Sequence, residues 1–316
     1  MQMRNSNMPF NERINFQRIL CPIGLTTDSD EALRYAIALA KAYRAKLFVM
    51  HCAGAYATTS STNLCHIQDS LEDLIKKHLR LPASSGLDAG IIVSEGDPSI
   101  EIAREAAQRQ VDLIVMHSRR RPLAAALLGS TAETICRTAP SPVLVTHTHE
   151  LEWAGMTTNE ISLKRVLVAH DFSTDSELAL SYGISLAQEY HADLHLLHVL
   201  PVRTKSVAPE IALLPISAEI AFDEATNRLR RSVPEETYSR CRVKQVLYEG
   251  NPYREVLNYS EDQSIDLICM GASGTGFGTR ALFGSNSDRV LRQAPCPVLI
   301  ARPLKPMITS VNVAIA

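Results

Sequence analysis

The residues best placed to do chemistry in this chain are three glycines and a serine near its carboxyl end. Nine residues separate Gly271-Ala272-Ser273-Gly274 from Gly284-Ser285-Asn286. Glycines let backbone N–H groups approach an anion closely and tolerate positive φ angles. If Gly284 precedes a helix, the N–H groups of its first turn and the Ser285 hydroxyl can bind phosphate. On the glycines alone, a phosphate site and a flexible surface loop are equally good interpretations.

The loop matches neither of two common nucleotide motifs. A Walker A sequence requires a lysine, and no lysine lies between Gly271 and Gly284. The segment Gly274-Thr275-Gly276-Phe277-Gly278 resembles part of a dinucleotide fingerprint. That fingerprint follows the first strand of its fold, whereas this segment follows the fourth predicted strand. Any phosphate site here is therefore of another kind.

An acidic residue is placed where it can complete a nucleotide site. Asp171 follows the apolar run of residues 165–170, which predicts a buried strand. Its carboxylate can accept hydrogen bonds from ribose hydroxyls or hold a metal ion near phosphates. The alternative role is that of a turn or helix-capping residue. His170 and His198 can face the same cleft, although the core or its rim is the more usual place for such histidines.

Alternating strand and helix patterns would bring these residues together. Apolar runs at 165–170, 193–199, 242–248, 265–270 and 298–301 predict strands. A helix with apolar residues from Leu178 to Ala187 is predicted after the first of them, and further helices at 218–233, 253–260 and 285–292. Ser173 or Thr174 can cap the first helix, with Glu177 available for a capping box. This order predicts a mainly parallel, doubly wound sheet. Such sheets bind ligands at the carboxyl ends of their strands, where the strand order reverses.

The same pattern occurs twice in the chain. Arg18-Ile19-Leu20 returns as Arg165-Val166-Leu167 after 147 residues, and Asp112-Leu113-Ile114 returns as Asp266-Leu267-Ile268 after 154 residues. The run Ala-Pro-x-Pro-Val-Leu at 139–144 returns at 294–299. A period of this length indicates two copies of a whole domain rather than a solenoid. We therefore predict two α/β domains, residues 1–150 and 160–305, joined by a polar stretch from about 148 to 163.

Composition and charge restrict the partners that we expect. The 316 residues suffice for two domains with cores of their own, and 46% hydrophobic with 21% charged residues is ordinary for a globular protein. A net charge of −2 gives no field that would attract nucleic acid or an anionic membrane. No apolar run approaches the ~20 residues that span a bilayer, and residues 1–13 do not resemble a secretory signal. We expect a cytoplasmic protein without nucleic acid or membrane partners.

The cysteines argue for the same compartment. Seven are scattered through the chain, without a CxxC pair, and an odd number fits no complete disulfide framework. A reducing environment fits this usage. His51-Cys52 and Cys65-His66 match no zinc-binding spacing, so no metal site is predicted.

Taken together, these motifs resemble the universal stress protein family. The spacing of Gly271, Gly274, Gly284 and Ser285 is similar to the ATP-binding signature of that family. Asp171, Gly250-Asn251-Pro252, Met270-Gly271 and the Ala-Pro-x-Pro-Val-Leu run are also similar, and the resemblance covers residues 18–147 and 164–302. It implies an adenine-nucleotide alpha-hydrolase-like fold with five mainly parallel strands in each copy. It also implies pairing of the copies through their last strands, here within one chain as a pseudo-dimer.

The resemblance also implies which residues hold the nucleotide. Ala169 and Asp171 would lie at the adenine and ribose end, and the backbone of Val199 would meet adenine. Ribose and phosphates would be surrounded by Met270, Gly271, Ser273, Gly274, Thr275, Gly284, Ser285 and Asn286. The implied ligand is ATP, with or without Mg²⁺, and AMP or ADP are alternatives.

The first copy departs from this pattern. Gly24 stands where Asp171 does, His117 replaces Gly271 and Arg120 replaces Gly274; the glycine loop is one residue shorter, and Gly129-Ser130-Thr131 remains. A side chain at each lost glycine would obstruct the backbone. Arg119 to Arg121 could instead recruit an anion by charge. We predict that this degenerate copy has a structural role and covers the edge strand of the second copy.

Three functions are therefore considered. The first is an ATP-binding universal stress protein in which the nucleotide biases conformation or partner choice in the stress response. The second is a weak ATPase or nucleotidyl transferase, which would need a base and a cation at the phosphates. Arg280 is the one cation near the loop and no base is evident, so we assign no catalytic residue. The third is a nucleotide-free interaction scaffold. A homodimer and an unidentified protein partner stay open.

Overall fold

The computed structural model describes residues 14–24, 30–53, 67–75, 86–118, 129–147, 161–201, 216–274 and 283–302. The named elements of the first half are β1 (Arg18–Pro22), α1 (Asp30–Tyr43), β2 (Lys46–Ala53), β3 (Ala89–Glu95), α3 (Pro98–Gln108), β4 (Leu113–His117), α4 (Ser130–Thr138) and β5 (Val143–Thr146). Those of the second half are β6 (Arg165–Ala169), α5 (Thr174–Tyr190), β7 (Asp193–Pro201), α6 (Ile216–Ser232), the 3-10 helix η3 (Glu235–Ser239), β8 (Val243–Gly250), α7 (Pro252–Asp262), β9 (Leu267–Gly271), α8 (Ser285–Gln293) and β10 (Val298–Ala301).

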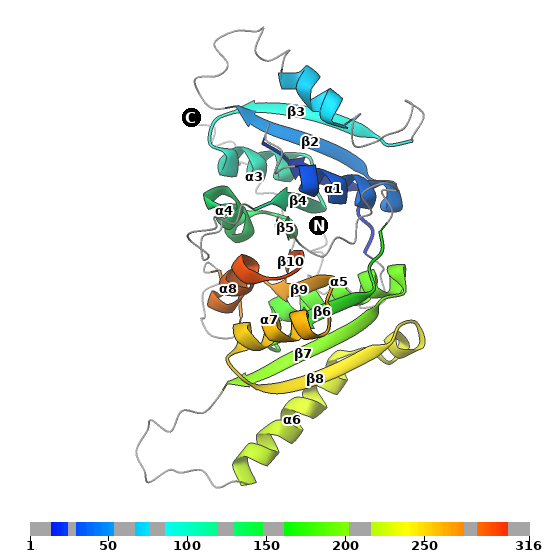
Figure 1. The fold of residues 1–316 in the computed structure, drawn as a ribbon, viewed down its shortest axis with the longest axis vertical. Coiled ribbons are helices and arrows are strands. Elements are labelled where there is room, and N and C mark those ends of the chain that lie inside the picture. Colours follow the sequence, from blue (N-terminus) through cyan, green and yellow to red (C-terminus); the bar gives the residue numbers. More distant parts are fainter. Residues whose placement is uncertain are drawn as a thin grey trace, which may run out of the picture.

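The strands of the described residues form one ten-stranded sheet that runs the length of the molecule (Figure 1). Its order is β3-β2-β1-β4-β5-β10-β9-β6-β7-β8, so each half contributes five parallel strands in the same order. The halves meet where β5 pairs antiparallel with β10, with Leu144 opposite Leu299. The predicted α/β class with two doubly wound halves is confirmed, and the pairing through the last strands lies within one chain.

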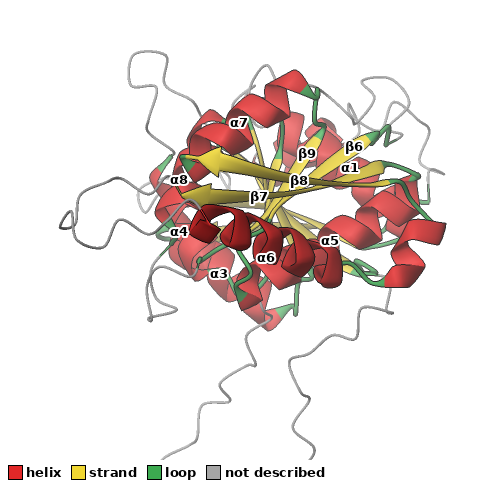
Figure 2. Cartoon of the chain, turned by 90° about the horizontal axis from the view of Figure 1, so that it is seen from below, coloured by secondary structure: helices red, strands yellow, loops and turns green. Residues whose placement is uncertain are grey.

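Helices cover both faces of the sheet (Figure 2). In β6, Val166 and Val168 point toward α5, whereas Leu167 points toward the side of α7 and α8. All three side chains are fully buried. Burial on both faces explains why these strands read as continuous apolar runs rather than alternating ones.

An ion network joins the halves beside the strand seam. The Arg292 guanidinium binds Asp288 of its own helix at 2.8 Å and Glu133 of the first half at 3.1 Å. Arg137 binds Glu133 at 2.7 Å, so α4 and α8 are bridged by charges of alternating sign. Asp288, through its hydrogen bond, and then Glu133 raise the pKa of Arg292. The first half is therefore packed against the second through side chains as well as strands.

The structure differs from the sequence predictions mainly at segment boundaries. The predicted polar linker is too long, because Leu163 is 3% exposed and belongs to the core. The helix predicted from 253 to 260 is α7, which continues to Asp262, and β8 continues to Gly250. A helical segment at residues 67–75, between β2 and β3, corresponds to α6 of the second half, as the repeat predicts. β7 ends at Pro201, and residues 202–215 lie outside the described residues.

A histidine in the core gives the fold a pH dependence. His195 of β7 is 5% exposed, and its Nδ1 lies 2.8 Å from the hydroxyl of Tyr259. Burial, and then the charge of Lys244, lower the pKa of His195 to about 4. In the unfolded chain the imidazole has a pKa of about 6.5. Unfolding at intermediate pH therefore takes up a proton.

We expect stability to fall as the pH drops from about 6.5 to about 4. Above pH 6.5, His195 is neutral in both the folded and the unfolded protein, and its contribution to stability is fully present. Between pH 6.5 and 4 the unfolded chain binds the proton while the folded protein does not, which favours unfolding. The loss attributable to His195 is up to about 3 kcal/mol. Urea unfolding of the wild type and His195→Leu at several pH values measures it. The variant should lack this part of the slope, while His198, whose pKa is also lowered by burial, acts in both proteins. Equal slopes would contradict the assignment.

Candidate functional site

The predicted site lies where the strand order of the second half reverses. β6 and β9 are neighbours there, and Ala169 pairs with Met270 at the same level of the sheet. The chain leaves β6 through Asp171 toward α5 and leaves β9 through Ser273 and Gly274. These segments, about 100 residues apart in sequence, therefore meet at the carboxyl edge of the sheet (Figure 1). Such a switch point is the usual ligand position on open α/β sheets.

Asp171 and Gly274 face each other across this edge. A Cβ atom added to Gly274 would lie 2.6 Å from Asp171 Oδ2. The other carboxylate oxygen, Oδ1, accepts a hydrogen bond from the Ser173 N–H at 3.1 Å. The turn role that competed with ligand binding is therefore real, and Oδ1 carries it. The second oxygen is directed toward the glycine loop.

Gly271 is required by packing rather than by a turn. A Cβ atom at this position would lie 2.8 Å from the backbone carbonyl carbon of Asp175, in the first turn of α5. Among the described residues the glycines with positive φ are Gly86 and Gly96. Of the two properties expected of the loop glycines, close approach is therefore the one used at Gly271 and Gly274, and positive φ is not used at Gly271, Gly274 or Gly284.

Two residues that the sequence did not single out fix the loop. The Ser273 N–H donates to Asp175 Oδ2 at 3.0 Å, which ties the glycine loop to α5. The Ser287 hydroxyl donates to the Gly271 carbonyl at 2.9 Å, and the Gly284 N–H donates to the Ala272 carbonyl at 2.9 Å. These bonds close the base of the loop. The repeat of Thr-Asp-Ser at 27–29 and 174–176 was the available signal for Asp175.

The start of α8 agrees with the prediction. Gly284 is the N-cap and supplies no side-chain hydrogen bond, with φ −63° and ψ 136°. Ser285 and Asn286 follow in the first turn and are exposed. The partial positive charge of the first turn is therefore directed at the switch point. Thr275 and Arg280 lie outside the described residues.

The histidines at this edge are structural. His170 is 3% exposed; its Nδ1 accepts the Phe172 N–H, and its Nε2 lies 3.3 Å from a Glu177 oxygen. His198 donates through Nδ1 to the His170 carbonyl at 2.7 Å, and burial lowers its pKa. The side chain of Val199 is buried with α7 and α8, and its backbone pairs with Tyr248 of β8; the adenine contact stays a prediction.

Arg302 connects this edge to the first half. It follows β10, is 9% exposed and donates to the carbonyl of Cys136 at the end of α4. Burial lowers the pKa of Arg302, whereas the charges of Cys136 and Asp175 act in the opposite direction. The aspartate that holds the glycine loop is thus in the field of a cation anchored on the first half.

The family of the chain follows from comparison with known proteins. The model of the universal stress protein family matches residues 15–147 and 162–302. The chain belongs to this family. A universal stress protein of Mycolicibacterium smegmatis is 26% identical over 305 residues, 90% of this chain and 97% of that protein. One of Bacillus subtilis is 32% identical over 148 residues, 44% of this chain and 98% of that protein.

Solved universal stress proteins share the fold. A crystal structure from Archaeoglobus fulgidus covers 90% of this chain and 98% of its own, with 22% identity and a TM-score of 0.62. Another solved universal stress protein is in complex with cAMP; it is 20% identical and covers 43% of this chain and 99% of its own, with a TM-score of 0.32. The bound cAMP is a property of that solved protein.

The first universal stress domain has a side chain at the position where the second has Gly271. His117 stands at the position of Gly271, and its Nδ1 lies 3.7 Å from Glu31 Oε2 of α1. A Cβ atom at Gly271 would lie 2.8 Å from the backbone of α5. A residue with a side chain, such as His117, does not fit so close a contact with a helix. The N-cap Gly129 of α4 is kept, again without a side-chain cap. Arg120 lies outside the described residues.

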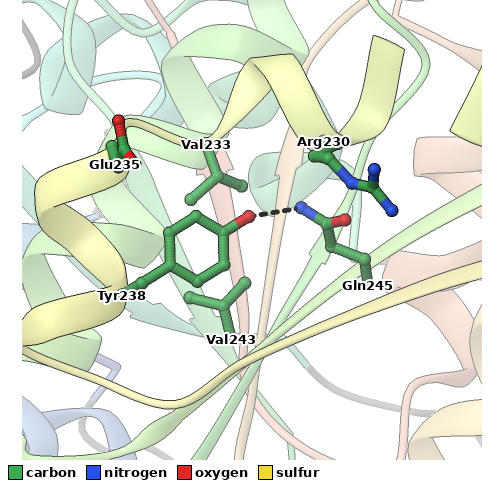
Figure 3. Close-up of a pocket in the computed structure, with 6 residues that line it drawn as sticks. All are labelled: Arg230, Val233, Glu235, Tyr238, Val243 and Gln245. Carbon is green, nitrogen blue, oxygen red and sulfur yellow. Dashed lines mark hydrogen bonds between the residues drawn. The ribbon is translucent and has the colours of Figure 1, made fainter. Parts of the chain in front are cut away.

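A shallow hollow elsewhere in this universal stress protein is unrelated to the switch point. Figure 3 shows Tyr238 hydrogen bonded to Gln245 at 2.7 Å within it. Val243 in its wall begins β8, so the hollow lies at the amino edge of the sheet, opposite the glycine loop. The six lining residues are Arg230, Val233, Glu235, Tyr238, Val243 and Gln245.

Two further features of this universal stress protein concern metals and membranes. Within the described ranges, no three His, Cys, Asp or Glu side chains are grouped so that they could hold a metal ion. Cys65 and His66 lie outside those ranges. No helix among the described residues has the length and apolar character to cross a bilayer.

Proposed function

We propose that the second domain binds one ATP at the β6–β9 switch point, and that the bound nucleotide biases conformation or partner choice in a cytoplasmic stress response. The observation that carries this proposal is the close approach of Asp171 to Gly274 over the ends of two neighbouring strands. A Cβ atom added to Gly274 would lie 2.6 Å from Asp171 Oδ2. A carboxylate suited to ribose hydroxyls thereby lies beside a loop suited to phosphates.

The ligand contacts that we propose are those that the resemblance to the family implies. Ala169, Asp171 and the Val199 backbone form the adenine and ribose end. Ribose and phosphates lie along the loop and the first turn of α8, at Met270, Gly271, Ser273, Gly274, Thr275, Gly284, Ser285 and Asn286. Ser285 and Asn286 are exposed and their helix has no side-chain cap, which leaves the first turn for an anion.

Binding is favoured over catalysis by the carboxylates at this site. A phosphoryl-transfer enzyme needs a base or water-positioning group and cations at the γ-phosphate. Asp171 holds the turn through Ser173, and Asp175 holds the loop through Ser273. Both carboxylates therefore already position backbone. If Mg²⁺ accompanies ATP, Asp171 is the residue that would hold it.

Analysis of the nucleotide released from purified, denatured protein tests the proposal. We expect ATP, or ADP from its breakdown, and an increase in thermal stability on adding ATP. Saturation at 100 times Kd contributes about 2.7 kcal/mol, which corresponds to a shift of several degrees. Parallel samples with AMP, ADP and cAMP identify the ligand. Absence of both released nucleotide and thermal shift would sink the proposal in favour of a scaffold, and turnover of ATP that Asp171→Asn abolishes would favour an enzyme.

A further inference from the structure

Two arginines gather on one tyrosine at the α7 side of the glycine loop. Arg254 Nε donates to the Tyr253 hydroxyl at 3.0 Å, and the Arg289 guanidinium carbon lies 4.7 Å from the centre of the same ring. The hydrogen bond from Arg254, and then the charges of both arginines, lower the pKa of Tyr253. In this cluster of Tyr253, Arg254 and Arg289, both arginines are exposed, whereas the Tyr253 ring is half-buried and packs against the core.

The cluster adjoins the end of the site where phosphates are proposed. Arg289 is four residues after Ser285 on α8, so both side chains lie on one helix face. Helical side chains lean toward the amino end, which brings the guanidinium toward Ser285. Tyr253 and Arg254 belong to the first turn of α7, which lies beside α8 (Figure 1). Cations from two helices thus converge next to the start of α8.

This placement is electrostatically unfavourable without an anion. Positive side chains near the amino ends of helices oppose the helix dipole, and two like charges on one ring repel each other. Of the nearby carboxylates, Asp288 is already bound by Arg292 through two hydrogen bonds. Glu255, in the first turn of α7, is folded against Gly250, where a Cβ would lie 2.6 Å from its Oε1. The guanidinium groups of Arg254 and Arg289 can therefore bind an anion.

The first domain provides an internal comparison. Its residues at the three positions are Ser99, Ile100 and Thr134, none of which is charged. There the N-cap Asp97 accepts hydrogen bonds from the backbone of residues 99 and 100, whereas Asn251 makes no side-chain cap. The domain that lacks the switch-point glycines has an acidic cap and no cation at these positions, and the domain that keeps them has two arginines. The cations accompany the glycine motif.

We propose that Arg254 and Arg289 bind the terminal phosphates of the nucleotide, so that the site selects nucleoside triphosphates over monophosphates. Tyr253 orients the two guanidinium groups toward the same anion. This inference rests on the proposed function. Guanidinium groups suit it because they donate bidentate, charge-assisted hydrogen bonds to phosphate oxygens.

Calorimetric titration of the full chain with ATP and AMP tests the selection. For the wild type we expect tighter binding of ATP than of AMP. Arg289→Ala should weaken ATP binding about tenfold, as expected for one charge-assisted hydrogen bond, and should leave AMP within about twofold. Arg254→Ala should act in the same direction, and Arg289→Lys should retain most of the preference. Arg242→Ala is the matched control, because its side chain is 81% exposed at the opposite edge of the sheet.

The outcomes separate the two proposals. If the wild type binds neither nucleotide, the proposed function fails and the inference fails with it. If it binds ATP and AMP equally, or if Arg289→Ala weakens both equally or neither, the selection is overturned while nucleotide binding stands. Thermal unfolding of each variant excludes loss of structure as the cause, and Arg242→Ala should change neither affinity.

Discussion

Gly271→Ala is expected to destabilise the protein by about 1–3 kcal/mol, although it adds a single methyl group. The new Cβ would lie 2.8 Å from backbone atoms of Asp175 in the first turn of α5, and backbone cannot rotate away as a side chain can. Urea unfolding at pH 7 measures the change. The variant should also bind nucleotide less tightly, because α5 carries the carboxylate that holds Ser273.

Gly129→Ala is the matched control for this substitution. Gly129 lies at the start of α4 with φ −59°, and a Cβ there meets nothing within 4 Å. Its stability should stay within about 0.5 kcal/mol of the wild type, as for most surface substitutions. Equal stabilities of the two variants would show that α5 yields to the methyl group, and the packing explanation for Gly271 would be wrong.

Gly274→Val should reduce ATP affinity at least tenfold with little effect on stability. Gly274 is exposed, and its Cβ would come within 2.6 Å of Asp171 Oδ2, so the valine displaces the carboxylate rather than the core. Losing a hydrogen bond to a charged group costs about 1.5–3 kcal/mol, or roughly ten- to a hundredfold in affinity. Titration calorimetry measures the loss.

A double-mutant cycle identifies the carboxylate as the cause. If Gly274→Val acts by displacing Asp171, it should add little to the effect of Asp171→Ala, because both remove the same interaction. Fully additive effects would mean that the valine blocks the ligand directly or that Asp171 has no part in binding.

The strands and the repeat can be predicted because they depend on local patterns. Runs such as 165–170 and 265–270 are buried on both faces, and their apolar character is visible without the fold. The start of α8 is likewise predicted by a local pattern, the residues Gly284-Ser285-Asn286. Leu163 falls within the predicted polar linker because one apolar residue in a polar stretch gives no periodic signal.

The reasons for individual residues at the site depend on tertiary contacts. The sequence indicates that Gly271 allows a close backbone approach, but not that the approach is to α5, almost 100 residues earlier in the chain. Asp175 is one of several acidic residues in a first turn, and its bond to Ser273 depends on the packing of α5 against β9. The Tyr253–Arg289 contact likewise joins two helices that the sequence separates by more than 30 residues. Spacing alone does not reveal such pairs.

The second domain carries the proposed binding site, and the first domain supports it. The first domain closes the edge of the second through β5 and bridges to it through Glu133 and Arg302. Arg302 binds the first half through the Cys136 carbonyl, and the charge of Asp175 acts to raise the pKa of this arginine. This gives a physical reason for keeping a domain whose switch point has lost its glycines.

The stoichiometry of ATP binding tests the central claim most directly. Calorimetric titration of the full chain should give one ATP per chain. Gly284→Val should abolish that binding, and Gly129→Val, the same change at the corresponding N-cap of the first domain, should leave it intact. A stoichiometry of two or zero, or loss of binding in Gly129→Val with retention in Gly284→Val, would contradict the assignment of the site to the second domain.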